Sequence, residues 1–222
     1  MASQHPGWLA DCLTDRPTDR YSPGKFAAAS ACRINDRDSP LMKLVLFNKP
    51  FQVMSQFSAQ PGRQTLADYL AIPGIYPAGR LDADSEGLML LTDDGQLQHQ
   101  ISHPKHKEAK TYTVQVEGIP DAASLARLRL PLDLRDFVTQ ACQVEAIEEP
   151  AWLWPRDPPV RKRLSIPTSW LAITIKEGKN RQVRRMTAAV GFPTLRLIRS
   201  AIGPCSLTSH PLQPGEWVYL PA

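Results

Sequence analysis

The chain has 222 residues, of which 42% are hydrophobic, and a modest formal net charge of +4. That length suits one or two globular domains, and no uncharged apolar run reaches the roughly eighteen residues that a membrane helix requires, so no membrane association is expected. The N-terminus lacks the basic-then-apolar order of a signal peptide, and the four cysteines form no CxxC pair. These features disfavour a secreted disulfide framework or a zinc ribbon, and a reducing cytoplasm is the expected compartment.

Residues 1–40 mix Pro, Ser, Asp and Arg without apolar periodicity, which predicts a disordered tail that cannot bury a core. Beyond them, apolar and alternating runs predict strands over 43–47, 87–92, 111–117, 141–147, 169–176, 195–198, 204–207 and 216–220. Helices are predicted over 96–101, 121–130 and 180–190. Many strands with few helices, not in strict alternation, predict an α+β domain around a mixed, mostly antiparallel sheet.

Positive charge is concentrated late in the chain. Between residues 156 and 199, eleven lysines and arginines stand against Asp157 and Glu177, so this segment carries +9 and the remainder of the chain −5. Such asymmetry suits a protein that meets phosphates with one face, although a solvated basic surface has the same composition. Part of the segment belongs to 150–168, where five prolines and three successive basic residues predict an irregular, extended loop.

The densest chemical signal is the segment AGRLDADSEGLMLLTDDG over 78–95, in which acids, an arginine and glycines precede a predicted strand. The spacing of Asp82, Asp84, Glu86 and Asp93 approaches that of a calcium-binding EF-hand loop. An EF-hand loop lies between two helices, however, and the prolines and glycines that precede Arg80 exclude the first helix. We therefore expect no metal here, and a solvated acidic turn is the simplest alternative to a functional site.

This segment resembles the active-site motif of the RsuA-type pseudouridine synthases, and two further motifs follow in the family's order. KTYTV over 110–114 is similar to the family's K-x-Y motif, and EGKNRQVRRM over 177–186 resembles its third motif. Together the three motifs extend the resemblance over about residues 43–220, and the segment EEPAWLWPRDPP is similar to members that modify a uridine of large-subunit ribosomal RNA. The resemblance implies the pseudouridine synthase fold, isomerisation of uridine to pseudouridine, and no cofactor.

The family usually carries an RNA-binding domain of the S4 type ahead of its catalytic body. Only about 40 residues precede Leu41 here, so we expect no S4 domain. We expect a catalytic domain over 41–222, with a candidate division into subdomains 41–108 and 109–222. The expected partner is large-subunit ribosomal RNA, and the expected oligomeric state is a monomer.

The resemblance also assigns roles to single residues. Asp82 matches the catalytic carboxylate, which would act either as a nucleophile or as a base that removes a sugar proton. Tyr112 matches a tyrosine that stacks on the target base, and Lys179 matches a cation that pairs with the catalytic Asp and keeps it ionised. Candidate RNA-binding residues are the cations near these motifs and in the irregular loop, namely Arg80, Arg181, Arg184, Arg185, Arg161, Lys162 and Arg163.

Several alternatives stay open. A non-catalytic ribosomal RNA-binding or assembly factor would keep the fold and the basic surface without needing Asp82. A glycosidase would need a second carboxylate within about 10 Å, for which Asp84 or Glu86 would have to serve. The aromatic residues Trp152 and Trp154 suit either stacking on RNA bases or packing of the loop.

Overall fold

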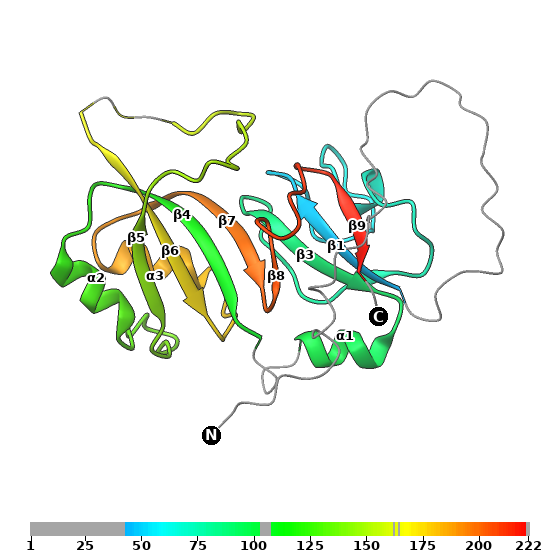
Figure 1. The fold of residues 1–222 in the computed structure, drawn as a ribbon, viewed down its shortest axis with the longest axis horizontal. Coiled ribbons are helices and arrows are strands. Elements are labelled where there is room, and N and C mark those ends of the chain that lie inside the picture. The colour runs from blue at the N-terminus through cyan, green and yellow to red at the C-terminus, as the bar shows by residue number, and fades with distance from the viewer. Residues whose placement is uncertain (1–42, 103–107, 162, 164, 221–222) are drawn as a thin grey trace.

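The computed structural model describes residues 43–102, 108–161, 163 and 165–220, so the tail predicted over 1–40 lies outside the described residues. Its strands are β1 (Leu44–Lys49), β2 (Tyr76–Pro77), β3 (Glu86–Thr92), β4 (Lys110–Glu117), β5 (Gln143–Ile147), β6 (Thr168–Ile175), β7 (Thr194–Ile202), β8 (Cys205–Ser206) and β9 (Trp217–Leu220). They form one sheet in the order β5-β6-β4-β7-β3-β1-β9, with β2 paired to β3 and β8 to β7. Figure 1 shows the sheet extending through two halves of the molecule, with β4 to β8 in one and β1, β3 and β9 in the other.

The two halves of the sheet meet where β3 lies beside β7. This pair is parallel and joins only Glu86 to Ile198 and Gly87 to Arg199, whereas every other strand pair described is antiparallel. The mixed, mostly antiparallel sheet predicted from the sequence is therefore confirmed. Because so few residues pair at this junction, side chains close to it must supply much of the contact between the halves.

Gly87 makes the junction sterically possible. Its backbone has a φ of +106°, and a Cβ placed on it would lie 2.4 Å from the carbonyl oxygen and 2.6 Å from the amide nitrogen of Arg199. A side chain of any size would force β3 and β7 apart, so only glycine permits this approach.

Alternating side chains of the central strands fill two cores on opposite faces of the sheet. From β1, Val45 and Phe47 enter the larger core, and Leu44 and Leu46 enter the smaller one. Helices α2 (Ala122–Arg129) and α3 (Gln182–Ala189) and the short 3-10 helix Leu66–Asp68 cover the larger core, and α1 (Gly95–Ser102) packs against the smaller. Strand β3 is buried along its whole length because both of its faces are covered, which explains the run of four apolar residues over 88–91.

The helices begin at residues that local chemistry specifies. The Asp94 carboxylate accepts hydrogen bonds from two backbone N–H groups of α1, and Asp121 caps α2 by accepting from the Ser124 N–H at 2.8 Å. Helix α3 begins two residues later than predicted, because Arg181 adopts a left-handed conformation with a φ of 47° and lies just outside the helix. The prediction that α3 starts at Asn180 was therefore wrong.

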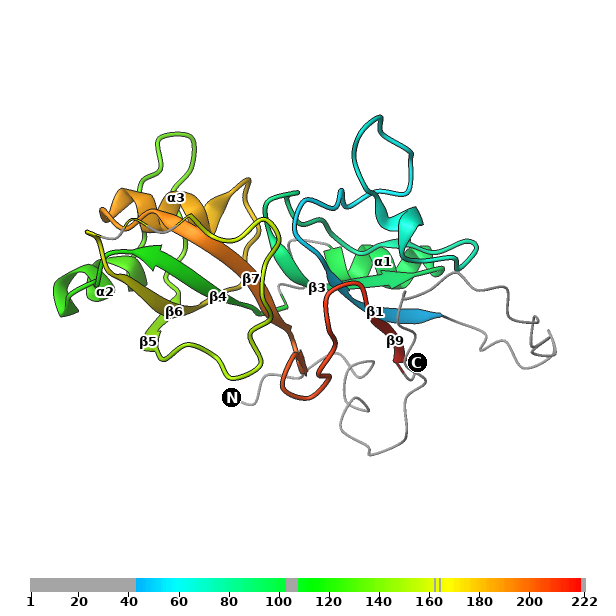
Figure 2. The same cartoon turned by 90° about the horizontal axis from the view of Figure 1, so that it is seen from above.

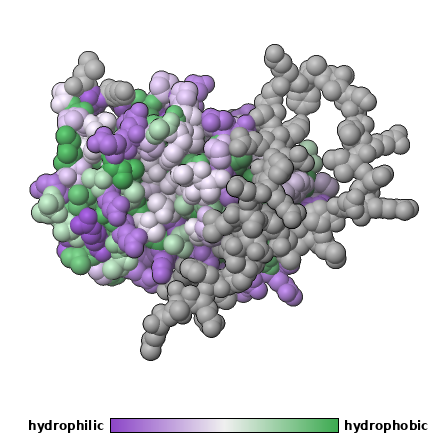
Figure 3. Space-filling view, in the orientation of Figure 1, coloured by the Kyte–Doolittle hydropathy of each residue, from purple (hydrophilic) through white to green (hydrophobic). Residues whose placement is uncertain are grey.

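Few large hydrophobic side chains are exposed on the described surface. Figure 3 shows hydrophobic and hydrophilic residues interspersed on the visible described face. The exposed large hydrophobic residues are Tyr76, Ile119, Leu130, Val138 and Tyr219. In the described part of the chain, no helix has the length and apolar character needed to cross a bilayer.

Candidate active site

Asp82 begins the acidic turn (residues 82–85) that leads into β3. The preceding Leu81 is buried in the larger core, and the hydroxyl of Ser55 fixes its backbone. That hydroxyl donates to the Leu81 carbonyl at 2.6 Å and accepts from the Leu81 N–H at 3.1 Å. The Asp82 side chain is 41% exposed. A firmly held backbone thus presents this carboxylate to solvent.

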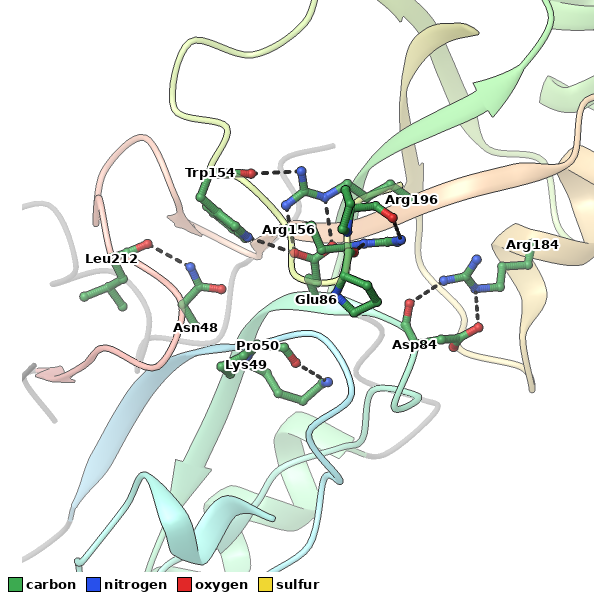
Figure 4. Close-up of polar contacts among 12 residues, drawn as sticks. Asn48, Lys49, Pro50, Asp84, Glu86, Trp154, Arg156, Arg184, Arg196 and Leu212 are labelled. Atoms are coloured by element: carbon green, nitrogen blue, oxygen red, sulfur yellow. Dashed lines mark hydrogen bonds and ion pairs between the residues drawn. The ribbon is translucent and has the colours of Figure 1, made fainter. Parts of the chain in front are cut away.

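Lys49, at the end of β1, is fully buried against the acidic turn. Its Nζ donates to the carbonyls of Pro50 at 2.8 Å, Val53 at 2.9 Å and Ala83 at 3.4 Å. The Gln52 N–H donates to the same Ala83 carbonyl at 2.7 Å. Burial lowers the pKa of Lys49 to about 7. Figure 4 shows Lys49 with its contact to Pro50 beside the strand that carries it. The amine therefore connects the acidic turn to the loop that follows β1.

Two arginines at the start of α3 bind the acidic turn. Arg181 donates to both carboxylate oxygens of Asp84, at 3.1 and 2.9 Å, and its Nη1 lies 3.6 Å from Oδ2 of Asp82. Arg184 donates to the Asp84 carbonyl at 2.6 Å, and its Nε lies 3.4 Å from the Asp84 carboxylate (Figure 4). The first and third motifs, remote in sequence, thus meet through three charged side chains and place a cation beside Asp82.

The shared carboxylate of Asp84 stays ionised. Burial by itself would raise the pKa of Asp84, but the hydrogen bonds from Arg181 and the charge of Arg184 more than offset this, and the pKa is lowered. The hydrogen bonds to Asp84 also raise the pKa of the Arg181 guanidinium. The acidic turn and the start of α3 therefore form a charged cluster in which Arg181 is the nearest cation to Asp82.

The cation beside Asp82 differs from the one expected. Lys179 was predicted to pair with Asp82, but its Nζ lies over the ring of Phe137 at 5.8 Å, and the ion pair belongs to Arg181. The left-handed backbone of Arg181 explains the difference, because it turns the residue out of the helix at the point where α3 meets the acidic turn. The pairing predicted for Lys179 is therefore corrected to Arg181.

Tyr112 lies on β4 and is only 8% exposed. It belongs to the larger core, together with Leu81 from the residue before Asp82 and Val183 from α3. The alternation of β4 predicted that Tyr112 lies in the core, and this is confirmed. The core cluster that contains Tyr112 also supports the acidic turn. Only a small part of the Tyr112 ring is accessible for stacking on an RNA base. The stacking role of Tyr112 therefore stays a prediction.

The predicted RNA-binding cations fall into distinct environments. Arg80 and Arg161 are exposed, and Lys162 lies outside the described residues. Arg163 pairs with Glu117 at 3.2 Å, and Arg185 pairs with Asp136 and lies over the Phe137 ring.

The three arginines near the start of α3 do not share one environment. Arg184 is largely buried, Arg181 lies outside the helix, and each of the three is bound to an aspartate. Their contact with RNA phosphates therefore stays a prediction.

A buried ion pair lies directly behind the acidic turn. Arg196 donates to both carboxylate oxygens of Glu86 at 2.8 Å, and the Trp154 indole N–H also donates to this carboxylate at 2.8 Å. Arg196 completes the group by donating to the Trp154 carbonyl at 2.9 Å (Figure 4). Trp154 is buried, so for this residue the packing alternative is correct.

Sequence reasoning gave no role to Lys49 or Arg196, and assigned Asp84 and Glu86 only to the calcium and glycosidase alternatives. A charged residue at the end of an apolar strand, followed by proline, was the available signal for Lys49. The other roles depend on contacts between remote segments.

Comparison with known proteins places this geometry among enzymes of RNA modification. The sequence model of the family described as RNA pseudouridylate synthase matches residues 43–189. The ribosomal large subunit pseudouridine synthase E of Vibrio vulnificus is 57% identical over 175 residues, which cover 79% of this chain and 74% of that protein. The protein of the same name from Vibrio parahaemolyticus is 50% identical over 216 residues, covering 97% of this chain and 88% of that protein.

A solved structure shows the same fold. The crystal structure of a pseudouridylate synthase superposes with a TM-score of 0.67 at 29% identity, covering 81% of this chain and 70% of that chain. The acidic turn and helix α3 both lie within residues 43–189, which the family model matches.

Proposed function

The chain belongs to the RNA pseudouridylate synthase family, and we propose that it isomerises a specific uridine of large-subunit ribosomal RNA to pseudouridine, using Asp82. Family membership makes it an isomerase of RNA uridine. The names of the Vibrio relatives support the large-subunit RNA as substrate. The observation that carries the assignment of Asp82 is its geometry, an accessible carboxylate on a fixed turn with the Arg181 guanidinium 3.6 Å away.

The reaction explains why such a carboxylate is needed. The bond from ribose C1′ to N1 of the base breaks, the base turns, and C1′ bonds to C5, so the target uridine must first leave its stack. Asp82 would serve as a nucleophile at C1′ or C6, or as a base that removes the C2′ proton. Each of these routes requires the ionised carboxylate, whose negative charge Arg181 stabilises.

Two further steps are proposed for neighbouring residues. After C1′ bonds to C5, the proton on C5 must leave and N1 must gain one. Tyr112 supplies a ring for contact with the flipped base and a hydroxyl for this proton transfer. Lys179 remains a candidate catalytic residue by its place in the third motif, without direct contact to Asp82. The exposed cations Arg80 and Arg161 are proposed to contact phosphates.

The proposal extends to the state of the protein in the cell. The scattered exposed hydrophobic residues support a monomer. We further propose that it acts in the cytoplasm on RNA of the large ribosomal subunit, and that the catalytic domain spans 41–222. Light scattering of the purified full chain measures the oligomeric state, and a stable dimer would contradict the proposal of a monomer.

The decisive experiment incubates the purified protein with transcribed large-subunit RNA and maps pseudouridine along it. Asp82→Asn is compared with Asp133→Asn, which removes the same charge from an exposed residue whose carboxylate accepts only the Arg135 N–H. We expect one new pseudouridine with the wild type and with Asp133→Asn, and none with Asp82→Asn.

The other outcomes separate the alternatives. No pseudouridine with the wild type would refute the enzymatic proposal and favour a non-catalytic assembly factor. Modification by Asp82→Asn at the wild-type rate would refute the assignment of Asp82. Release of free base from the RNA would indicate a glycosidase.

A further inference from the structure

The segment 148–161, here called the strap, lies between β5 and β6 and contacts the other half of the molecule at Glu86 and Phe51. Figure 2 shows it leaving β5 on one side of the sheet and rising past the β3–β7 junction toward the side that carries α3. Its path is fixed by Trp154, whose indole N–H and carbonyl both bind the Glu86–Arg196 pair. Trp152 packs against Trp154, with the ring centroids 5.6 Å apart. A segment rich in proline thus has a fixed anchor close to the acidic turn.

Arg156, two residues beyond this anchor, is held in one orientation by neutral groups. Its guanidinium lies over the ring of Phe51, 4.2 Å from the centroid. Its Nε donates to the Pro158 carbonyl at 2.8 Å, and Nη2 donates to the Pro159 carbonyl at 3.2 Å. Only two of the five N–H donors of an arginine are used in this way.

The charge of Arg156 is not neutralised by an ion pair. Among the described residues, no carboxylate oxygen lies within 4.0 Å of its guanidinium nitrogens. Arg181, Arg184 and Arg185 differ in this respect, because each contacts an aspartate. Glu86 acts on Arg156 only at longer range, through its charge. A preorganised cation with free donors and no carboxylate in direct contact is the arrangement expected of a group that binds an external anion.

The position of Arg156 places this cation near the active site. Phe51, on which it stacks, precedes Gln52, whose N–H binds the Ala83 carbonyl in the acidic turn. Burial chiefly lowers the pKa of the Arg184 guanidinium, and repulsion by the charges of Arg181 and Arg156 adds to the effect. Figure 4 shows Arg156 between the Glu86–Arg196 pair and the Asp84–Arg184 pair.

We propose that Arg156 binds a phosphate of the RNA strand that enters the active site, and that the strap forms one wall of the RNA-binding cleft. The inference rests on the proposed function, since it takes RNA to be the substrate. The stacking on Phe51 and the bonds to the strap carbonyls have already restricted the side chain, so little conformational entropy is lost when the phosphate binds. The role of Trp154 is to position Arg156.

The test compares Arg156→Gln with Arg129→Gln. Arg129 is a matched control because its guanidinium also donates to a backbone carbonyl, that of Val144, and it lies in α2 at the outer end of the molecule (Figure 1). Binding of transcribed large-subunit RNA is measured over a range of KCl concentrations. Arg156→Gln should weaken binding about tenfold at low salt and reduce the slope of log K against log salt by roughly 0.7, while Arg129→Gln matches the wild type.

Two companion variants address folding and positioning. Arg156→Lys keeps the charge, so it should restore most of the salt slope but not the full affinity, because the planar fork is lost. Trp154→Phe removes the indole N–H that holds the strap. When Trp154→Phe is combined with Arg156→Gln, the loss of RNA affinity should be smaller than the sum of the two single losses, because both changes disturb the same phosphate contact. In activity assays Arg156→Gln should raise KM for the RNA with kcat changed by less than about twofold.

The outcomes also separate this inference from the proposed function. If the wild type forms pseudouridine but Arg156→Gln has the same salt slope as Arg129→Gln, the phosphate site is refuted and the enzyme stands. If the wild type forms no pseudouridine while Arg156→Gln still lowers affinity and slope, the phosphate site stands and the enzymatic proposal fails. Should Arg156→Gln not fold, the same comparison is made between Arg156→Lys and the wild type, and equal affinity would overturn the proposal.

Discussion

Asp84 determines where two arginines lie relative to Asp82, the proposed catalytic carboxylate. It binds Arg181 through both oxygens and Arg184 through its carboxylate and carbonyl, so the start of α3 is held against the acidic turn. The resemblance to the family motifs assigned the chemistry to Asp82, but it named Lys179, and not Arg181, as the cation beside it. That distinction depends on the left-handed backbone at one residue, which no local pattern specifies.

Asp84→Asn should therefore separate catalysis from binding. The amide keeps the shape of the side chain but no longer holds Arg181 beside Asp82. We expect kcat to fall about tenfold or more with a smaller change in KM, because a misplaced catalytic neighbour costs mainly the chemical step. Asp133→Asn serves as the control, and an unchanged kcat for Asp84→Asn would contradict the positioning role.

Lys49 is a buried base whose titration should be visible in stability. Its pKa is about 7 in the folded protein and 10.5 ordinarily, so between these values the unfolded chain binds more protons. The contribution of Lys49 to the free energy of unfolding is therefore least below about pH 7 and rises with pH up to about 10.5, by at most roughly 1.4 kcal/mol per pH unit.

Urea denaturation of the wild type and of Lys49→Met on both sides of pH 7 measures this effect. The variant should be less stable throughout, by about 3 kcal/mol near neutrality, because the carbonyls of Pro50 and Val53 lose their Lys49 donor and the Ala83 carbonyl keeps only the Gln52 N–H. Its deficit should grow as the pH rises. A deficit that does not depend on pH would mean that the three carbonyls keep the ammonium charged.

At the scale of elements, apolar alternation and capping residues predicted most of the fold. The principal strands and all three α-helices of the described chain lie within a few residues of their predicted bounds. Strand β2 and the 3-10 helix Leu66–Asp68 were not predicted, because two or three residues carry no periodicity. The proline-rich loop is irregular as predicted, but the burial of Trp154 within it depends on Glu86 in β3, which no local pattern reveals.

The junction of β3 and β7 gives a prediction about glycine. Gly87 and Gly79 share a φ of +106°, but a Cβ on Gly79 would meet nothing within 4 Å, whereas one on Gly87 would collide with the backbone of Arg199. Gly79→Ala should cost about 1 kcal/mol for backbone strain alone. Gly87→Ala should cost at least about 3 kcal/mol or prevent folding, because β3 and β7 must separate. Thermal melts of the two variants make the comparison, and equal losses would show that the close approach does not matter.

The whole molecule is organised around this junction. Strand β9, at the end of the chain, pairs with β1, so the half that contains β1 and β3 also contains the C-terminal strand. A division of the chain at residues 108 and 109 therefore does not follow the sheet, although two halves on either side of the β3–β7 pair remain a useful description. Besides the two backbone pairs of that junction, the halves share the Glu86–Arg196 ion pair and the strap residue Trp154.

The Glu86–Arg196 pair should accordingly be strongly coupled in stability. Both side chains are almost completely buried, at 2% and 5% exposure, so removing one partner leaves an uncompensated charge away from water. Glu86→Gln and Arg196→Met should each lower the free energy of unfolding by roughly 3–5 kcal/mol. The loss of unfolding free energy in the double variant should be clearly smaller than the sum of the losses in the two single variants, because the double variant buries no unpaired charge.

The exposed pair Arg163–Glu117 provides the control for this double-mutant cycle, in which the two single variants are compared with the double variant. Its side chains are 56% and 18% exposed, so its coupling energy should stay below about 1 kcal/mol and fall with added salt. The buried pair should couple by about 2 kcal/mol or more with little dependence on salt, since solvent ions do not reach it. Urea denaturation of both cycles at two salt concentrations measures this difference. Similar small couplings for both pairs would show that the Glu86–Arg196 pair contributes little to holding the two halves of the molecule together.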